Sequence, residues 1–86
     1  MLIISFKATF LKQMNKLEKA LADEVFEKIE FFKNKENHKM LKVHKLHGRF
    51  SGCFSFSIDY KTRIIFKYET RNEVVFLAIG DHDLYK

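Results

Sequence analysis

The second half of this 86-residue chain gathers side chains that bind phosphate and transfer protons. Arg63 lies within "YKTRIIFKY", and the closing "IGDHDLYK" contains His82 and Tyr85. The segment "HKLHGRF" adds His44, Lys45, His47 and Arg49. A guanidinium binds phosphate through two parallel hydrogen bonds, and histidine exchanges protons near neutral pH. These residue types favour acid–base chemistry at a phosphodiester.

Cleavage of RNA without a metal ion needs groups of this kind. A base removes the proton from a 2′-hydroxyl, a cation stabilises the phosphorane charge, and an acid protonates the departing 5′-oxygen. Histidine, arginine and tyrosine or lysine can fill these roles, and an aromatic ring can stack on an unpaired base. The chain has one cysteine, Cys53, and its histidines show no familiar ligand spacing, so we predict neither a metal site nor another cofactor.

The formal charge of +5 is unevenly distributed along the chain. Between positions 37 and 67, seven Lys or Arg accompany a single acid, Asp59, whereas the two signs nearly balance elsewhere. Lys61 and Lys67 belong to this basic stretch. Such a local excess indicates an anionic partner, with nucleic acid the leading candidate.

The apolar pattern of the first half predicts a strand over 2–6 and a helical region over 8–33. Apolar residues recur there at steps of three and four, and the length favours a helical hairpin with a break near 17–22. Thr9 is a candidate N-cap, and "NKEN" at 34–37 indicates a turn. Leu11 and Phe31 broaden the apolar stripe and are candidates for a partner surface.

The second half predicts strands that would position the basic side chains. "LKVHKLHGRF" is expected to form one strand, while "TRIIFKYE" and "EVVFLAIG" form two more around a "TRNE" turn. The run 74–79 is apolar on both faces, so it should lie inside the sheet. "FSFSIDY" alternates as a half-buried strand does, with Phe54, Phe56, Ile58 and Tyr60 on the buried face and Ser55, Ser57 and Asp59 on the other. The same alternation directs Arg63 and Lys67 away from the helices if Ile64, Phe66 and Tyr68 face them.

The expected fold is one α+β domain over 1–86, in the order β-α-α-β-β-β. The N-terminal strand and helical hairpin would pack as a second layer on one face of a mainly antiparallel sheet. The opening residues predict neither a signal peptide nor a membrane-spanning segment, so the expected location is the cytoplasm.

The order of elements and the tail together resemble the RelE/ParE superfamily of bacterial type II toxin-antitoxin toxins. The "IG-x-HD-x-Y" pattern lies at 79–85, and "HKLHGRFSGCFSFSIDYKTRIIFKY" is similar to the family's basic strand and following hairpin. The resemblance implies a ribosome-dependent mRNA endoribonuclease that inhibits translation. It also implies an antitoxin partner, through which the pair would bind operator DNA.

By the same resemblance, Arg63 matches the phosphate-stabilising arginine and His82 a catalytic histidine, with Tyr85 stacking on a base or transferring a proton. The set His44, Lys45, His47, Arg49, Lys61 and Lys67 would contact RNA, and His47 is also a catalytic candidate. Ser57 stands where many relatives have arginine, and the basic strand lacks glutamate, so His47 or His82 would be the base. Two alternatives are a ParE-like gyrase inhibitor without nuclease activity and an inactive homologue that binds the antitoxin.

Overall fold

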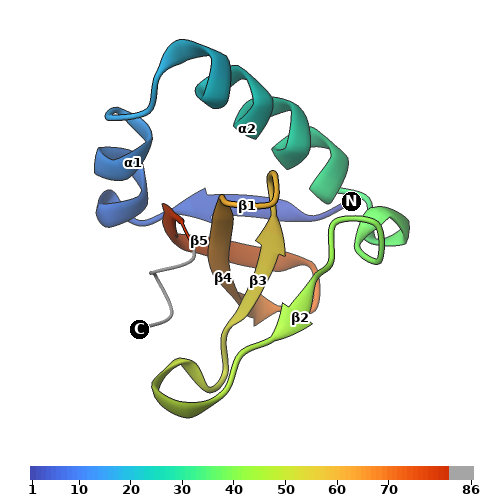
Figure 1. The fold of residues 1–86 in the computed structure, drawn as a ribbon. Helices are drawn as coiled ribbons and strands as arrows, with labels where there is room; N and C mark the ends of the chain where they lie inside the picture. Colours follow the sequence, from blue (N-terminus) through green and yellow to red (C-terminus); the bar gives the residue numbers. More distant parts are fainter. Residues whose placement is uncertain (82–86) are drawn as a thin grey trace.

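The computed structural model describes residues 1–81, in which a helical hairpin covers one face of a five-stranded sheet (Figure 1). The helices are α1 (Ala8–Met14) and α2 (Lys19–Phe32), and the 3-10 turns are η1 (Lys35–Asn37) and η2 (Gly48–Phe50). The strands are β1 (Ile3–Phe6), β2 (His44–Lys45), β3 (Phe54–Ser57), β4 (Arg63–Thr70) and β5 (Glu73–Gly80). The predicted α+β fold is confirmed.

The strands lie in the order β1-β5-β4-β3-β2, with β1 parallel to β5 and the other neighbours antiparallel. The strand β5 therefore has a neighbour on both sides, as its unbroken apolar run predicted. Near its end, the backbone N–H of Ile79 donates to Oε1 of Gln13 in α1 over 2.8 Å. This hydrogen bond links the end of β5 to helix α1.

The helical region breaks earlier than expected, at residues 15–18 instead of 17–22. Neither glycine nor proline marks the break. Tight turns end α1, since the N–H groups of Lys16 and Leu17 donate to the carbonyls of Gln13 and Met14. Thr9 lies inside α1, whose N-cap position is Lys7, so its predicted capping role is wrong.

Phenylalanine rings join the two layers. The ring of Phe32 in α2 lies 4.5 Å from Phe56, 4.9 Å from Phe66 and 5.5 Å from Phe76, between centroids. All four rings are fully buried. Each such side chain stabilises the fold by about 1.5–3 kcal/mol through removal from water. The core therefore fixes which face of β3, β4 and β5 turns toward the helices.

Two predictions about the strands need correction. Only His44–Lys45 of the basic segment pairs as a strand, because Gly48 (φ 67°) and Gly52 (φ 91°) turn the chain through η2. The strand β3 ends at Ser57, so Tyr60 lies in the β3–β4 hairpin and is 84% exposed instead of facing the core.

Candidate active site

The face of the sheet opposite the helices carries Arg63 and Lys67, two of the residues predicted to contact RNA. Ile64 and Phe66 belong to the core, so Arg63 and Lys67 project from the other face of β4, as the alternation predicted. Arg63 is half-buried and Lys67 is exposed.

The strand register brings Arg63 and His44 onto this face together. Arg63 pairs with Ser57 on one side and Gly80 on the other, while His44 pairs with Ser55, which in turn pairs with Ile65. Directly paired residues share a face of the sheet, and Ser55 and Ser57 lie two positions apart on β3. Arg63 and His44 therefore lie on the same face, in adjacent rows of paired residues. Strand spacing puts the Arg63 and His44 backbones about 10 Å apart across the sheet and about 7 Å along it.

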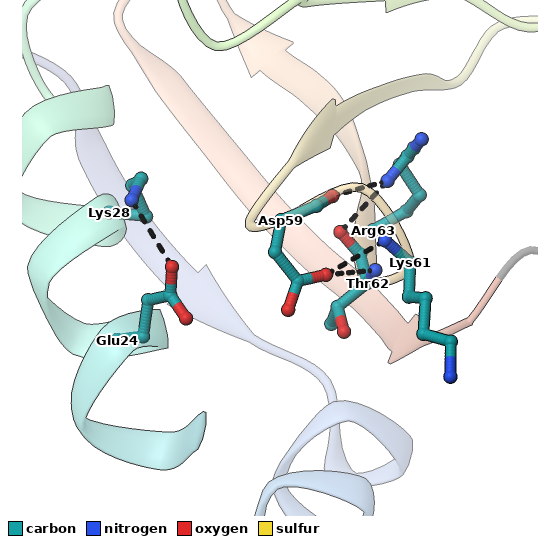
Figure 2. A network of polar contacts seen from close by, with 6 residues as sticks. All are labelled: Glu24, Lys28, Asp59, Lys61, Thr62 and Arg63. Atoms are coloured by element: carbon teal, nitrogen blue, oxygen red, sulfur yellow. Dashed lines mark hydrogen bonds and ion pairs between the residues drawn. The ribbon is translucent and has the colours of Figure 1, made fainter. Parts of the chain in front are cut away.

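A set of hydrogen bonds in the β3–β4 hairpin holds Arg63 (Figure 2). Oδ1 of Asp59 accepts from the backbone N–H groups of Lys61 (2.9 Å) and Thr62 (2.7 Å). The carbonyls of Asp59 and Thr62 then accept from Nη1 of Arg63, at 2.6 and 3.3 Å. The turn therefore orients the guanidinium through Nη1, and within the described residues Nη2 and Nε are left to reach a phosphate.

The carboxylate of Asp59 is kept ionised by this arrangement. Partial burial acts to raise its pKa, but the amide hydrogen bonds from Thr62 and Lys61 and the charge of Arg63 outweigh it and hold the pKa below its usual value. The ionised Asp59 stabilises both the turn and the cation beside it. Figure 2 shows the Lys61 side chain extending away from the guanidinium.

His44 has a defined tautomer. Its Nδ1 lies 2.8 Å from the carbonyl oxygen of Lys42, which can only accept, so Nδ1 carries the proton. In the neutral ring, Nε2 then has the free lone pair, and it lies 3.4 Å from the hydroxyl of Ser55. An imidazole held in this way can accept a proton at Nε2.

Sequence reasoning did not identify the groups that orient this histidine. Lys42 adopts φ 60°, the single positive φ among the non-glycine residues of 1–81, and its carbonyl meets the ring. Ser55 was expected on an exposed face but is fully buried. Both contacts depend on backbone geometry and strand register, for which the local sequence gives no clear signal.

The remaining basic residues are too scattered to line a single groove. His47 and Arg49 lie in the turn between β2 and β3, at the opposite end of β3 from Ser57 and Arg63. The guanidinium of Arg49 lies 5.1 Å from the Phe50 ring centroid. Lys45 pairs with Phe54 at the sheet edge, and Lys67 lies four residues along β4 from Arg63. His82 and Tyr85 lie outside the described residues.

The structure also places a further histidine and the single cysteine. His38 stacks on Phe32 at 4.5 Å, and its Nε2 lies 2.8 Å from the Phe32 carbonyl, so it supports the core. Cys53 is half-buried beside β3. Within residues 1–81, no three His, Cys, Asp or Glu side chains gather as metal ligands would.

A separate apolar groove lies between β1 and the helical hairpin. Its volume is about 630 Å³, and its walls include Phe6, Leu11, Met14 and Phe26. Phe6, Leu11 and Phe26 are 44%, 49% and 59% exposed, which is unusual for large apolar side chains on a small domain. Leu11 was predicted to lie on a partner surface, whereas Phe31 lines a different cavity.

Among residues 1–81, the helices are too short or too polar to span a membrane.

No protein-family model matches the sequence, and a search of curated proteins finds no match.

Solved structures do share the fold. The DinJ-YafQ toxin-antitoxin complex of Escherichia coli matches with a TM-score of 0.75 at 17% identity, over 96% of this chain and 94% of that one. The heterotetrameric YoeB-YefM toxin-antitoxin complex of Staphylococcus aureus gives 0.72 at 17% identity, over 95% and 98%. The RelBE2 complex of Mycobacterium tuberculosis gives 0.70 at 19% identity, over 94% and 98%. The chain therefore has the fold of the RelE, YoeB and YafQ toxins, as its sequence resemblance implied.

Proposed function

We propose that the chain is the toxin of a type II toxin-antitoxin pair and acts as a metal-independent, ribosome-dependent mRNA endoribonuclease. The observation that carries the proposal is the pairing of a phosphate-binding cation with a tautomer-fixed histidine on one face of a toxin fold. Arg63 is oriented by two hairpin carbonyls, and His44 by the Lys42 carbonyl.

The proposed reaction transfers the phosphoryl group within the RNA strand. A base takes the proton of the 2′-hydroxyl, the 2′-oxygen bonds to phosphorus, and the bond to the 5′-oxygen breaks as that oxygen gains a proton. The products are a 2′,3′-cyclic phosphate and a 5′-hydroxyl. Arg63 would stabilise the negative charge that builds up on the phosphorane oxygens.

His44 is the candidate base among the described residues. Its Nε2 lies 3.4 Å from the Ser55 hydroxyl in the resting structure, and it would exchange this contact for a hydrogen bond from a ribose 2′-hydroxyl. His47 lies at the far end of β3, which weakens its earlier assignment as base. His82 and Tyr85 keep the roles that the sequence resemblance gives them, with the acid as the natural role of His82 if His44 is the base.

The ribosome would hold the message in position, which the scattered basic residues do not do. Arg49 and Lys67 do not converge with Arg63 on one point, and Lys45 pairs with Phe54 on the other face of the sheet, so a free message would be held loosely. A message already positioned in the ribosome would need less orientation by the protein, and positioning alone accounts for a large part of many rate enhancements.

The apolar groove is the candidate docking site for the antitoxin. The backbone N–H groups of Ile3 and Lys7 bond toward β5, so the alternate residues Ile4 and Phe6 direct their backbone groups to the free edge of the sheet. A partner segment with apolar side chains could add as a strand at that edge and fill the groove. Exposed Lys7, Lys12 and Lys16 nearby favour an acidic partner.

The proposal is tested by mapping 5′ ends of an mRNA incubated with the purified protein, with and without translating ribosomes. We expect new 5′-hydroxyl ends that require ribosomes and disappear with Arg63→Ala. Intact message in both reactions would contradict the nuclease proposal. A gyrase supercoiling assay on the same preparation would then separate a ParE-like inhibitor from an inactive antitoxin-binding homologue.

A further inference from the structure

A second, smaller cavity lies beside Arg63, between α2, the segment before β2 and the β3–β4 hairpin. Its volume is about 290 Å³, at the small end of the range for small-molecule sites. Buried Leu41 and Ile58 form its floor, each 3% exposed. The backbone N–H of Ser57 donates to the Leu41 carbonyl over 2.9 Å, which joins two of the cavity walls.

The walls present large, exposed, polarisable side chains. Phe31 comes from α2, Met40 from the segment before β2, and Tyr60 from the hairpin. Their exposed fractions are 39%, 70% and 84%. Stacking and sulfur–aromatic contacts make aromatic and methionine side chains suited to a flat, polarisable ring.

The rim of this cavity is positively charged. Lys28, Lys42 and Arg63 line it, and the opposing carboxylate is Asp59, whose Oδ1 already accepts two backbone amides. Lys28 also lies 3.5 Å from Glu24 (Figure 2). The cavity thus combines an apolar, aromatic interior with a cationic rim, whereas the larger groove beside β1 is mainly apolar.

We infer that this cavity is a nucleobase subsite for single-stranded RNA, in which the base next to the phosphate at Arg63 stacks on Tyr60. A nucleotide joins a flat ring to an anion, and this is the combination that the walls and rim complement. A peptide would fit less well, because the cavity is small and three cations border it. The inference rests on the proposed function for the phosphate at Arg63, and it adds a determinant of base preference.

The test measures binding of a fluorescein-labelled single-stranded RNA hexamer by fluorescence anisotropy at low salt. Its 2′-O-methyl groups replace the nucleophilic hydroxyls, so the oligomer cannot be cut. We expect Tyr60→Ala to raise the Kd about 5- to 100-fold, the usual loss when one stacking ring is removed. Tyr60→Phe keeps the ring and should stay within about twofold.

The control variant is Phe26→Ala, which removes another exposed aromatic ring, from the apolar groove. It should leave the Kd of the oligomer unchanged. Because Tyr60 is 84% exposed, Tyr60→Ala should also keep the wild-type midpoint of thermal unfolding, which excludes misfolding as the cause.

A set of hexamers with one abasic position each makes the test specific. At one position, removal of the base should raise the Kd of the wild-type protein but not that of Tyr60→Ala, since the ring and the base form one interaction. Equal losses in both proteins, an unchanged Kd in Tyr60→Ala, or no binding by the wild type would each overturn the inference. If the protein cuts message on ribosomes but Tyr60→Ala binds the hexamer like the wild type, the subsite is wrong and the proposed nuclease stands. If Tyr60→Ala weakens hexamer binding but the wild type cuts no message, the subsite stands and the proposed nuclease is wrong.

Discussion

The hairpin site around Arg63 and the apolar groove beside β1 are built in opposite ways. Backbone carbonyls and amides within a few residues of one another orient Arg63, so its geometry is local. The groove instead needs β1, α1 and α2 to meet, and most of the side chains that line it are apolar. The difference indicates that the proposed reactive site and the proposed docking groove depend on different parts of the fold.

The two regions share no lining residue, so each should be alterable alone. A substitution that damaged both would indicate a common structural role, whereas selective effects would support the assignments made above.

Arg63→Ala should give the largest effect. We expect cleavage to fall about 100- to 1,000-fold, the usual result when a group that stabilises transition-state charge is removed. Arg63→Lys keeps the charge but loses the planar fork held by Asp59 and Thr62, so it should recover only part of the rate. Single-turnover cleavage measures the rate, and calorimetric titration with the antitoxin should show unchanged affinity. Equal losses of activity and thermal stability would point to a structural role instead.

His44→Ala should reduce cleavage about 100-fold, the usual loss when a general base is removed. Ser55→Ala is the matched control, since it removes the hydroxyl near Nε2 but leaves the bond from Nδ1 to the Lys42 carbonyl. Its rate should remain close to that of the wild type. Cleavage by His44→Ala at the wild-type rate would assign the base to another residue.

Phe26→Asp should weaken antitoxin binding by about 30-fold, a loss of about 2 kcal/mol that is typical of a central aromatic contact. Cleavage should not change, because Phe26 lies on the groove and away from Arg63. Glu27→Gln alters the next residue of α2, which does not line the groove, and should leave both properties intact. Antitoxin affinity unaffected by Phe26→Asp would place the docking site elsewhere.

Asp59→Asn should have the smallest effect, on the pH dependence of stability. The folded-state pKa of Asp59 lies below its unfolded value of about 3.9, so its contribution is present above that pH and is lost as the pH falls toward the folded value. The variant should lose less than about 1 kcal/mol at pH 7, since the group is partly solvated. Urea unfolding between pH 2 and 7 should show a shallower acid decline than in the wild type; an identical decline would contradict the assignment.

The sequence predicted the parts of this structure that depend on periodicity. The alternation in β4 correctly directed Arg63 and Lys67 away from the helices, and the apolar run of β5 predicted an interior strand. The break between α1 and α2 was misplaced by a few residues, since neither proline nor glycine marks it.

The finer geometry of the candidate site was less accessible from sequence. The orientation of His44 depends on a left-handed backbone at Lys42 and on register with Ser55, both set by packing across the sheet. Tyr60 continued the alternation of β3 in sequence but lies beyond the strand's end, where the hairpin turns. Periodicity assigns faces reliably, whereas strand ends and backbone turns decide which side chains reach a site.

The most direct test of the account compares three proteins in one translation reaction: the wild type, Arg63→Ala and Phe26→Asp. New 5′ ends in the message are mapped for each. The account predicts matching cleavage patterns for the wild type and Phe26→Asp, and no new ends for Arg63→Ala. Cleavage by Arg63→Ala at the wild-type rate, or its loss in Phe26→Asp, would contradict the separation of a reactive hairpin site from a binding groove.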